Sequence, residues 1–160
     1  MKILRLGLLL VMITFFISAC NKNMLFEENV AIPDGVWNQD NVVAFSFRIN
    51  DIKVPYNLYL NVRNTTYYPY RNVWLFITTN SPVGKSQVDT MELVLADEKG
   101  QWLGDGMGDY WDNQILYKSK AGFLLPGTYT VEIQQAMRRE DLPHILEVGF
   151  SVEKVDLKTK

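Results

Sequence analysis

Residues 43–49 read VAFSFRI, and this stretch decides the fold class. Its apolar side chains alternate with smaller or polar ones, in the order Val43, Ala44, Phe45, Ser46, Phe47, Arg48 and Ile49. A period of two places successive side chains on opposite faces of a strand, so one face is apolar and the other is not. The stretch therefore predicts a β-strand that buries one face.

The same period of two recurs along the chain, at residues 58–63, 90–95, 128–133 and 146–153. Turn signals separate these runs at residues 80–82, 98–100 and 126–127. The segment NVWLFITTN, residues 72–80, is apolar on both faces, as expected of a central or covered strand. No convincing amphipathic helix of three turns is found, and a helical turn is expected only in QAMRREDLPHIL, residues 135–146.

These patterns predict an all-β fold, a two-sheet antiparallel β-sandwich of jelly-roll-like type. Six to nine short strands, each with one apolar face, must form two sheets that cover each other. We expect a signal peptide at residues 1–19, a lipidated Cys20 with an extended tether to residue 36, the sandwich at 37–155 and a tail at 156–160.

The first twenty residues, MKILRLGLLLVMITFFISAC, have the pattern of a lipoprotein signal peptide. Lys2 and Arg5 precede an apolar run that is short against the ~20 residues of a spanning helix. The run closes on ISAC, a lipobox pattern in which the thiol of Cys20 is acylated and Cys20 becomes the N-terminus. Cys20 is the only cysteine, so acylation would remove any cysteine nucleophile, disulfide or zinc-thiolate site. The alternative is an ordinary signal peptide with a chance cysteine.

The charge balance excludes one class of partner. Without Lys2 and Arg5 the chain has fourteen basic and eighteen acidic side chains, and it has no basic stripe. Nucleic-acid-binding proteins need such a stripe to neutralise phosphates. We therefore expect no nucleic acid partner.

The motifs that could carry chemistry are incomplete. SPVGKS, residues 81–86, ends like a phosphate-binding loop, but Thr79 stands where that motif needs glycine. His144, the only histidine, is expected in a turn or at the surface. Asp105, Asp109 and Asp112 lack the spacing of an EF-hand, although calcium stays open. No pair of carboxylates is marked as a glycosidase pair, so we assign no catalytic, cofactor or metal residues.

The segment GQWLGDGMGDYWDN, residues 100–113, is expected to be a tight irregular connection. Glycines at 104, 106 and 108 suit positive φ angles and close backbone approach. We predict that Trp102 is mostly buried, that Leu103 joins the core, and that Asp105 and Asp109 bond to backbone amides at the turn.

Aromatic side chains gather near the strand ends. Rings at strand ends more often cover the core of a sandwich than stack on sugars, and we favour the first interpretation. Five of them form the candidate interaction surface, namely Tyr67, Tyr68, Tyr70, Tyr110 and Trp111.

Three segments together resemble one family, the GldH gliding-motility lipoproteins of the Bacteroidota. They are YNLYLNVRNTTYYPYRNVWLFI (56–77), DTMELVLADEKGQWLGDGMGD (89–109) and GTYTVEIQQAMRREDLPHILEVGFSVE (127–153). The resemblance runs from roughly residue 26 to residue 152, in the family's order, and the lipobox at Cys20 agrees with it.

The resemblance implies a non-enzymatic lipoprotein of the outer membrane, in a gliding machinery that is linked to type IX secretion. Its implied partners are the bilayer, through acylated Cys20, and other gliding or secretion proteins. No cofactor or active-site residue is known for the family, so none is carried over. The first acids after Cys20 are Glu27 and Glu28, and the lack of an acidic cluster directly after the cysteine favours the periplasmic face.

Two other classes remain as alternatives. The first is a carbohydrate-binding β-sandwich module on a lipid anchor, which rests on analogy between folds alone. The second is a glycosidase, which would need two carboxylates that face each other across a cleft.

Overall fold

The computed structural model describes residues 23–156, and the regular elements of this part of the chain are strands, apart from one short 3-10 turn. In chain order the elements are β1 (Met24–Ala31), the short 3-10 turn η2 (Pro33–Gly35), β2 (Val36–Asn38), β3 (Val43–Ile49), β4 (Tyr56–Thr65), β5 (Asn72–Asn80), β6 (Ser86–Val94), β7 (Asp105–Met107), β8 (Tyr110–Ala121), β9 (Gly127–Gln135), β10 (Asp141–Pro143) and β11 (Ile145–Lys154). Within these residues, no helix has the length and apolar character needed to cross a bilayer. The expected signal peptide, Cys20 and residues 157–160 lie outside the described residues.

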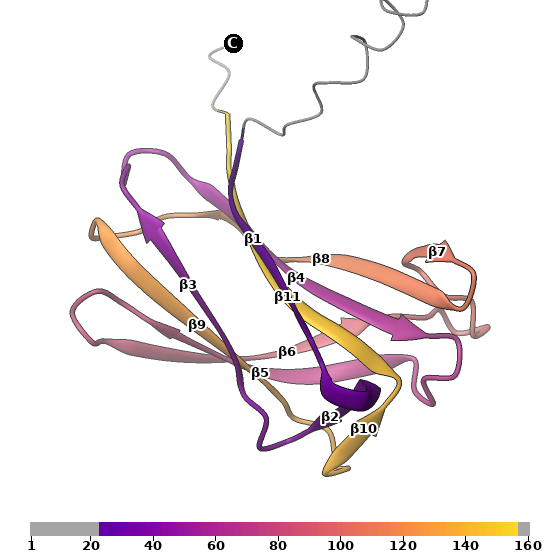
Figure 1. The fold of residues 1–160 in the computed structure, drawn as a ribbon. Coiled ribbons are helices and arrows are strands. Elements are labelled where there is room, and N and C mark those ends of the chain that lie inside the picture. Colours follow the sequence, from indigo (N-terminus) through magenta and orange to yellow (C-terminus); the bar gives the residue numbers. More distant parts are fainter. Residues whose placement is uncertain (1–22, 157–160) are drawn as a thin grey trace, which may run out of the picture.

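Two antiparallel sheets form a sandwich, as the alternating patterns predicted (Figure 1). One sheet has five strands in the order β1-β11-β4-β8-β7, and the other has four in the order β3-β9-β5-β6. The small ribbon β10-β2 lies at one end. Most connections carry the chain from one sheet to the other, and only β5-β6 and β7-β8 are hairpins between neighbouring strands. The all-β, two-sheet prediction is confirmed.

The core lies between the sheets and is rich in aromatic rings. Buried and exposed residues alternate strictly along β3, which is the pattern read from VAFSFRI. Phe45 and Phe47 of β3 contact Phe150 of β11, with ring centroids 6.3 and 5.7 Å apart. Such pairs contribute about 0.5–1.5 kcal/mol each beyond the area that they bury. Aromatic rings of one sheet therefore pack directly against a ring of the other sheet.

The sandwich has two ends that differ in what they carry. At the end called proximal here, β1 begins and β11 ends side by side, since Met24 pairs with Glu153 (Figure 1). Because all pairings are antiparallel, the connections 50–55, 81–85 and 122–126 lie at this same end. The connections 66–71, 108–109 and 136–140 lie at the opposite, distal end.

Three features differ from the sequence prediction. The expected tether contains β1, an edge strand of the larger sheet, whose Leu25, Phe26 and Val30 pack against the core. Strand β5 is central in its sheet but not covered, since Trp74 and Phe76 are 40 and 42% exposed on its outer face. Residues 136–140 form bends rather than a helical turn, and they lead into β10, which pairs with β2.

The segment SPVGKS is the turn of the β5-β6 hairpin. The Ser81 amide donates to the Lys85 carbonyl at 2.8 Å, and the Lys85 amide donates back to Ser81 Oγ at 3.0 Å. Gly84 has a φ of 76°, which a residue with a side chain rarely adopts. The Gly-Lys-Ser sequence therefore serves a reversal of the chain, not a strand-to-helix phosphate loop.

Candidate interaction surfaces

An aromatic cluster covers the distal end of the core. Tyr68 contacts Tyr70 and Trp102, with ring centroids 5.7 and 6.5 Å apart, and Trp102 stacks on Trp111 at 6.4 Å. The buried Tyr68 hydroxyl donates to the Asn72 carbonyl at 2.9 Å. Burial raises the pKa of Tyr68. The preference for a core-covering role is confirmed for these three rings, because Tyr68 lies in the core and Tyr70 and Trp102 pack against it.

The five aromatics of the candidate interaction surface do not share one role. Tyr68 is buried and cannot contact a partner, so its place in that surface is wrong. Tyr70 and Trp111 are half-buried, and Trp111 Nε1 donates to Thr66 Oγ1 at 3.1 Å. Tyr67 and Tyr110 remain exposed, at 68 and 50%. The surface that a partner can reach at this end is therefore built around Tyr67 and Tyr110.

The glycine-rich segment forms the β7-β8 hairpin. Gly108 turns the chain with a φ of 64°. A Cβ on Gly106 would lie 2.6 Å from Cζ3 of Trp111, so the glycine lets the indole lie on the backbone. The close backbone approach and the turn at Gly108 are confirmed, but Gly106 lies in strand β7 and not in an irregular connection, and neither Gly104 nor Gly106 has a positive φ.

Two details of that segment differ from expectation. Trp102 is half-buried rather than mostly buried. Leu103 follows the isolated bridge between Ala96 and Trp102, and it is 59% exposed instead of joining the core. Asp109 contributes its backbone carbonyl, which accepts from the Thr66 amide at 2.9 Å. Within residues 23–156, the carboxylates of Asp105 and Asp109 accept no hydrogen bond from a backbone amide. The turn is formed instead by the positive φ of Gly108.

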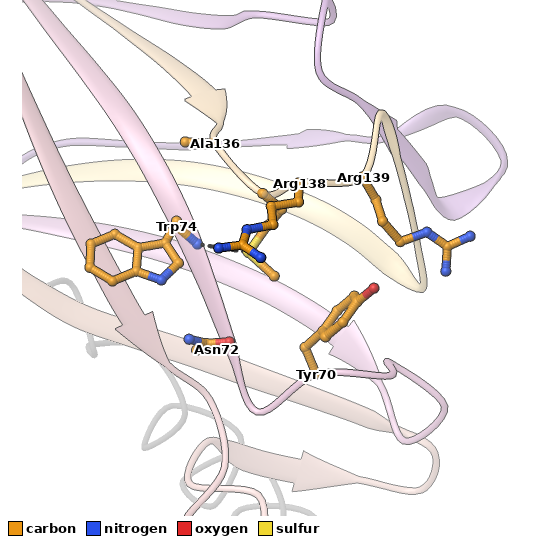
Figure 2. Close-up of a pocket in the computed structure, with 7 residues that line it drawn as sticks. Tyr70, Asn72, Trp74, Ala136, Arg138 and Arg139 are labelled. Carbon is orange, nitrogen blue, oxygen red and sulfur yellow. Dashed lines mark hydrogen bonds between the residues drawn. The ribbon is translucent and has the colours of Figure 1, made fainter.

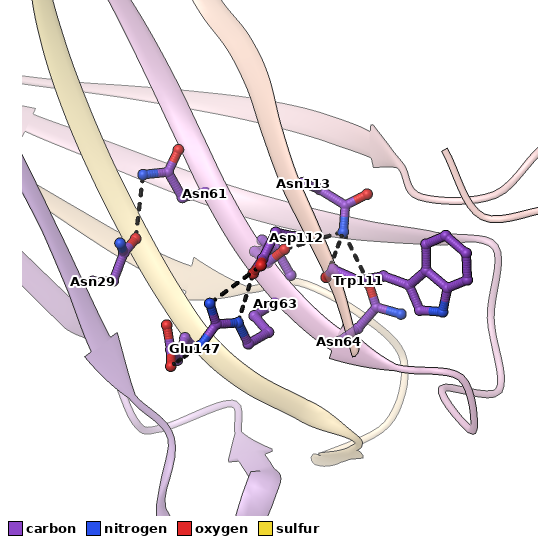
Figure 3. A network of polar contacts seen from close by, with 9 residues as sticks. Asn29, Asn61, Arg63, Asn64, Trp111, Asp112, Asn113 and Glu147 are labelled. Carbon is purple, nitrogen blue, oxygen red and sulfur yellow. Dashed lines mark hydrogen bonds and ion pairs between the residues drawn. The ribbon is translucent and has the colours of Figure 1, made fainter. Parts of the chain in front are cut away.

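A polar groove of about 310 Å³ crosses the outer face of the larger sheet (Figure 3). Arg63 is its centre, because it lies directly opposite Glu147 on β11 and Asp112 on β8. Its guanidinium donates to Asp112 Oδ1 and to Glu147 Oε1, both at 2.6 Å. The hydrogen bond to Asp112 is the largest of the effects that raise the pKa of Arg63. One cation therefore ties three neighbouring strands together.

Amide side chains extend the groove toward β1. Asn61 Nδ2 donates to Asn29 Oδ1 at 3.2 Å (Figure 3). Asn61 Nδ2 also donates to Ser151 Oγ at 3.2 Å, and Gln114 Nε2 donates to the same serine oxygen at 3.4 Å. Gly149 lies beneath Asn29, where a Cβ would meet the Asn29 oxygen at 1.8 Å. Such amides suit a neutral, hydroxyl-bearing ligand better than a charged one.

Arg63 holds two of the carboxylates that line the groove. Asp112 and Glu147 both accept hydrogen bonds from its guanidinium. Asp105, Asp109 and Asp112 were named as candidate calcium ligands. Within the described part of the chain, no group of three acidic, histidine or cysteine side chains converges in a way that could hold a metal ion.

A second hollow, of about 400 Å³, lies beside β5 at the distal end (Figure 2). Trp74 and Tyr70 line it together with Arg138 and Arg139 of the 136–140 connection. Figure 2 shows the Arg138 side chain extending toward Trp74, whereas Arg139 extends away from it. Neither guanidinium has a hydrogen-bond or ion-pair partner among residues 23–156. Trp, Tyr and Arg are the residues that most often dominate binding energy at protein interfaces.

His144 lies where the sequence predicted, in the bend between β10 and β11. Its φ is 69°, and its carbonyl accepts from the Thr65 amide at 3.0 Å. Its ring contacts Tyr67 with centroids 5.9 Å apart. The histidine therefore supports the distal end through its backbone carbonyl and its ring.

The sequence pattern does not show that Trp74, Arg138 and Arg139 are neighbours. A run that is apolar on both faces does not show which face stays exposed. The position of Arg63 on an outer face could be predicted from the sequence, because Asn61 and Arg63 alternate with buried residues of β4. Which strands flank β4, and hence which acids meet Arg63, depends on the sheet order.

The sandwich and these surfaces define a small all-β domain, whose exposed side chains include aromatic rings, amides and ion pairs. The chain belongs to the GldH lipoprotein family, which matches residues 24–152. It is 36% identical over 146 residues to the "gliding motility lipoprotein GldH homolog" of Christiangramia forsetii, covering 87% of this chain and 89% of that one. It is 33% identical over 163 residues to the "gliding motility lipoprotein GldH" of Flavobacterium johnsoniae, covering 98 and 100%.

Among solved structures, the chain is similar to the VP2 subviral particle of infectious bursal disease virus. The TM-score is 0.35 at 12% identity, and the match covers 87% of this chain and 36% of the viral one. A structure of the Gx strain of that virus matches with a TM-score of 0.34 at 11% identity, covering 85 and 31%. This chain thus spans about a third of the viral chains.

Proposed function

We propose that this protein is a non-enzymatic gliding-motility lipoprotein of the outer membrane, facing the periplasm, in a machinery linked to type IX secretion. Family membership over residues 24–152 carries the proposal, together with the gliding-motility names of both relatives. The exposed surfaces agree with it, because they offer side chains for binding and the paired carboxylates are occupied by Arg63.

The anchor in this proposal is an acylated Cys20. The lipobox motivates it, and the chain that follows Cys20 enters the sandwich at the proximal end. Two or three acyl chains hold a protein on a membrane far better than one, since each buried methylene adds about 0.8 kcal/mol. The distal end then points away from the lipid, toward partner proteins.

The partner surface is the distal end around Tyr67 and Tyr110, with the hollow beside Trp74. Both tyrosines are exposed, and the two guanidiniums of the hollow lack partners within residues 23–156. Arginine there can pair with an acidic side chain of a partner, while the rings supply apolar area. No catalytic step is assigned to any residue.

Fractionation of cells tests the anchor. We expect the protein in the outer-membrane fraction, with the mass of its N-terminal peptide increased by acyl chains on Cys20. A soluble periplasmic protein with an unmodified Cys20 would contradict the proposal. Deletion of the gene in the source bacterium tests the role in movement, since we expect loss of colony spreading that the wild-type gene restores and Cys20→Ser does not.

A second candidate function, carbohydrate binding, rests on the amides of the groove, which suit a hydroxyl-rich ligand. Asn29, Asn61 and Gln114 line it beside Arg63. The aromatic platform that a sugar would need is weaker, because Trp111 stacks on Trp102 and its indole nitrogen already donates to Thr66. Binding on a glycan array that Asn61→Ala and Trp111→Ala both abolish would favour this function, whereas no binding would remove it.

A further inference from the structure

The proximal end differs from the rest of the molecule in charge. Segments 48–58, 80–89, 117–128 and 153–156 make up this end, and they hold six basic and four acidic side chains. The other described residues hold five basic and fourteen acidic ones. A net positive end on an otherwise acidic domain is a surface that anionic groups attract.

The loops of the same end expose apolar side chains. They are Ile52, Val83, Leu124 and Leu125, and Leu124 is 89% exposed. An open hollow of about 580 Å³ lies next to them, lined by Phe123, Tyr129 and Leu58 and edged by Lys85 and Lys118. Apolar tips surrounded by lysines are typical of surfaces that lie in the interface of a lipid bilayer.

The chain that leads back to Cys20 starts at this end. The Lys154 amide donates to the Asn23 carbonyl, Lys154 pairs with Tyr56, and Tyr56 pairs with Ala121. Asn23 and Ala121 are therefore three strand spacings apart, about 14 Å. Cys20 is three residues before Asn23, a reach of at most about 11 Å. A lipid on Cys20 holds the bilayer surface close to these loops.

We propose that the proximal end lies directly on the bilayer, with Leu124 and Leu125 in its interfacial layer and Lys85 and Lys120 against anionic lipid phosphates. This inference rests on the proposed attachment through Cys20. The bilayer is the partner that fits this surface. The short reach from Cys20 keeps the membrane near, the positive charge attracts anionic lipids, and the exposed leucines suit the interfacial layer. The distal aromatic end is then directed away from the membrane.

Photocrosslinking to lipid tests this contact. The chain beginning at Cys20 is coupled through its only thiol to a maleimide-bearing lipid in vesicles of phosphatidylethanolamine with minor phosphatidylglycerol. The photoreactive residue p-benzoylphenylalanine replaces Leu124 in one variant. In the matched control it replaces Met107, which is also highly exposed, at 78% against 89% for Leu124, but lies at the distal hairpin. We expect several-fold more lipid crosslinks from position 124 than from position 107, and fewer after Lys85→Glu with Lys120→Glu.

Equal crosslinking from the two positions would overturn the proposal, and an unchanged yield in the charge-reversal variant would overturn the contact with phosphates. A crosslink from position 124 to another protein copy instead of lipid would also overturn it. Because the tether is made chemically, the result does not depend on acylation in cells. An unmodified Cys20 in cells would count against the proposed function alone.

Discussion

At the residue scale, Gly106 shows how one missing side chain shapes the distal end. The indole of Trp111 lies on its backbone, and a Cβ there would meet the ring at 2.6 Å. The indole also stacks on Trp102, so it cannot move without disturbing a second ring. The sequence predicted close backbone approach at this glycine but not which ring approaches it.

Gly106→Ala is therefore expected to destabilise the protein by about 1–3 kcal/mol, the usual cost of overpacking. Gly122→Ala is the matched control, because nothing lies within 4 Å of its added Cβ, and its stability should stay close to that of the wild type. Urea unfolding followed by circular dichroism measures both. Equal free energies of unfolding for the two variants would show that Trp111 does not need the glycine.

A second residue-scale effect depends on pH. Asp89 of β6 contacts Lys118 and Tyr117 of β8, and so joins the two sheets. The hydrogen bond from Lys118, followed by that from Tyr117, lowers the pKa of Asp89 from 3.8 to about 2. Because the folded pKa lies below the unfolded one, this stabilisation is complete above about pH 4 and is lost as the pH falls toward 2.

We expect Asp89 to contribute roughly 1 kcal/mol of acid-sensitive stability, after allowance for solvent screening of the partly exposed pair. Asp89→Asn should remove this share, so its free energy of unfolding should fall less between about pH 5 and pH 2 than that of the wild type. Urea titrations at the two pH values measure the difference. An equal decrease in the free energy of unfolding of both proteins would show that the contacts of Asp89 contribute no acid-sensitive stability.

At the element scale, β1 is the longest of the strands that the sequence did not place, the others being the short β2, β7 and β10. No residue of β1 is fully buried, and only a few apolar residues such as Phe26 and Val30 pack against the core, so its alternation is weak. The strands with both neighbours, such as β4 and β9, alternate clearly and were predicted. Exposure of Trp74 could not be predicted, because apolar content does not show whether anything covers a face.

Gly149 of β11 lets β1 lie close. A Cβ at this position would lie 1.8 Å from Asn29 Oδ1 and 2.8 Å from the Glu28 carbonyl oxygen. We expect Gly149→Ala to push β1 outward and to speed amide hydrogen exchange across residues 24–31. Asn29→Ala, which removes only the side chain, should speed it less, because the backbone pairing with β11 remains. Slow exchange in both variants would contradict a tight fit at Gly149.

At the scale of the whole molecule, the sandwich has a basic end with apolar loops, where β1 begins, and an aromatic end opposite to it. The sequence predicted the sheets, the core and the family. It could not predict the two ends, since they arise from the antiparallel register that brings residues 52, 83 and 124 together. The same register brings Arg63 between Asp112 and Glu147.

The central claim is that the distal end binds other proteins of the gliding or secretion machinery. Mild crosslinking in cells, followed by identification of the proteins that co-purify, tests it most directly. We expect wild-type protein to recover such partners, Tyr67→Ala with Tyr110→Ala to lose most of them, and the exposed control Val88→Ala on β6 to keep them. Recovery of glycan or peptidoglycan alone, or equal recovery by all three proteins, would contradict the account.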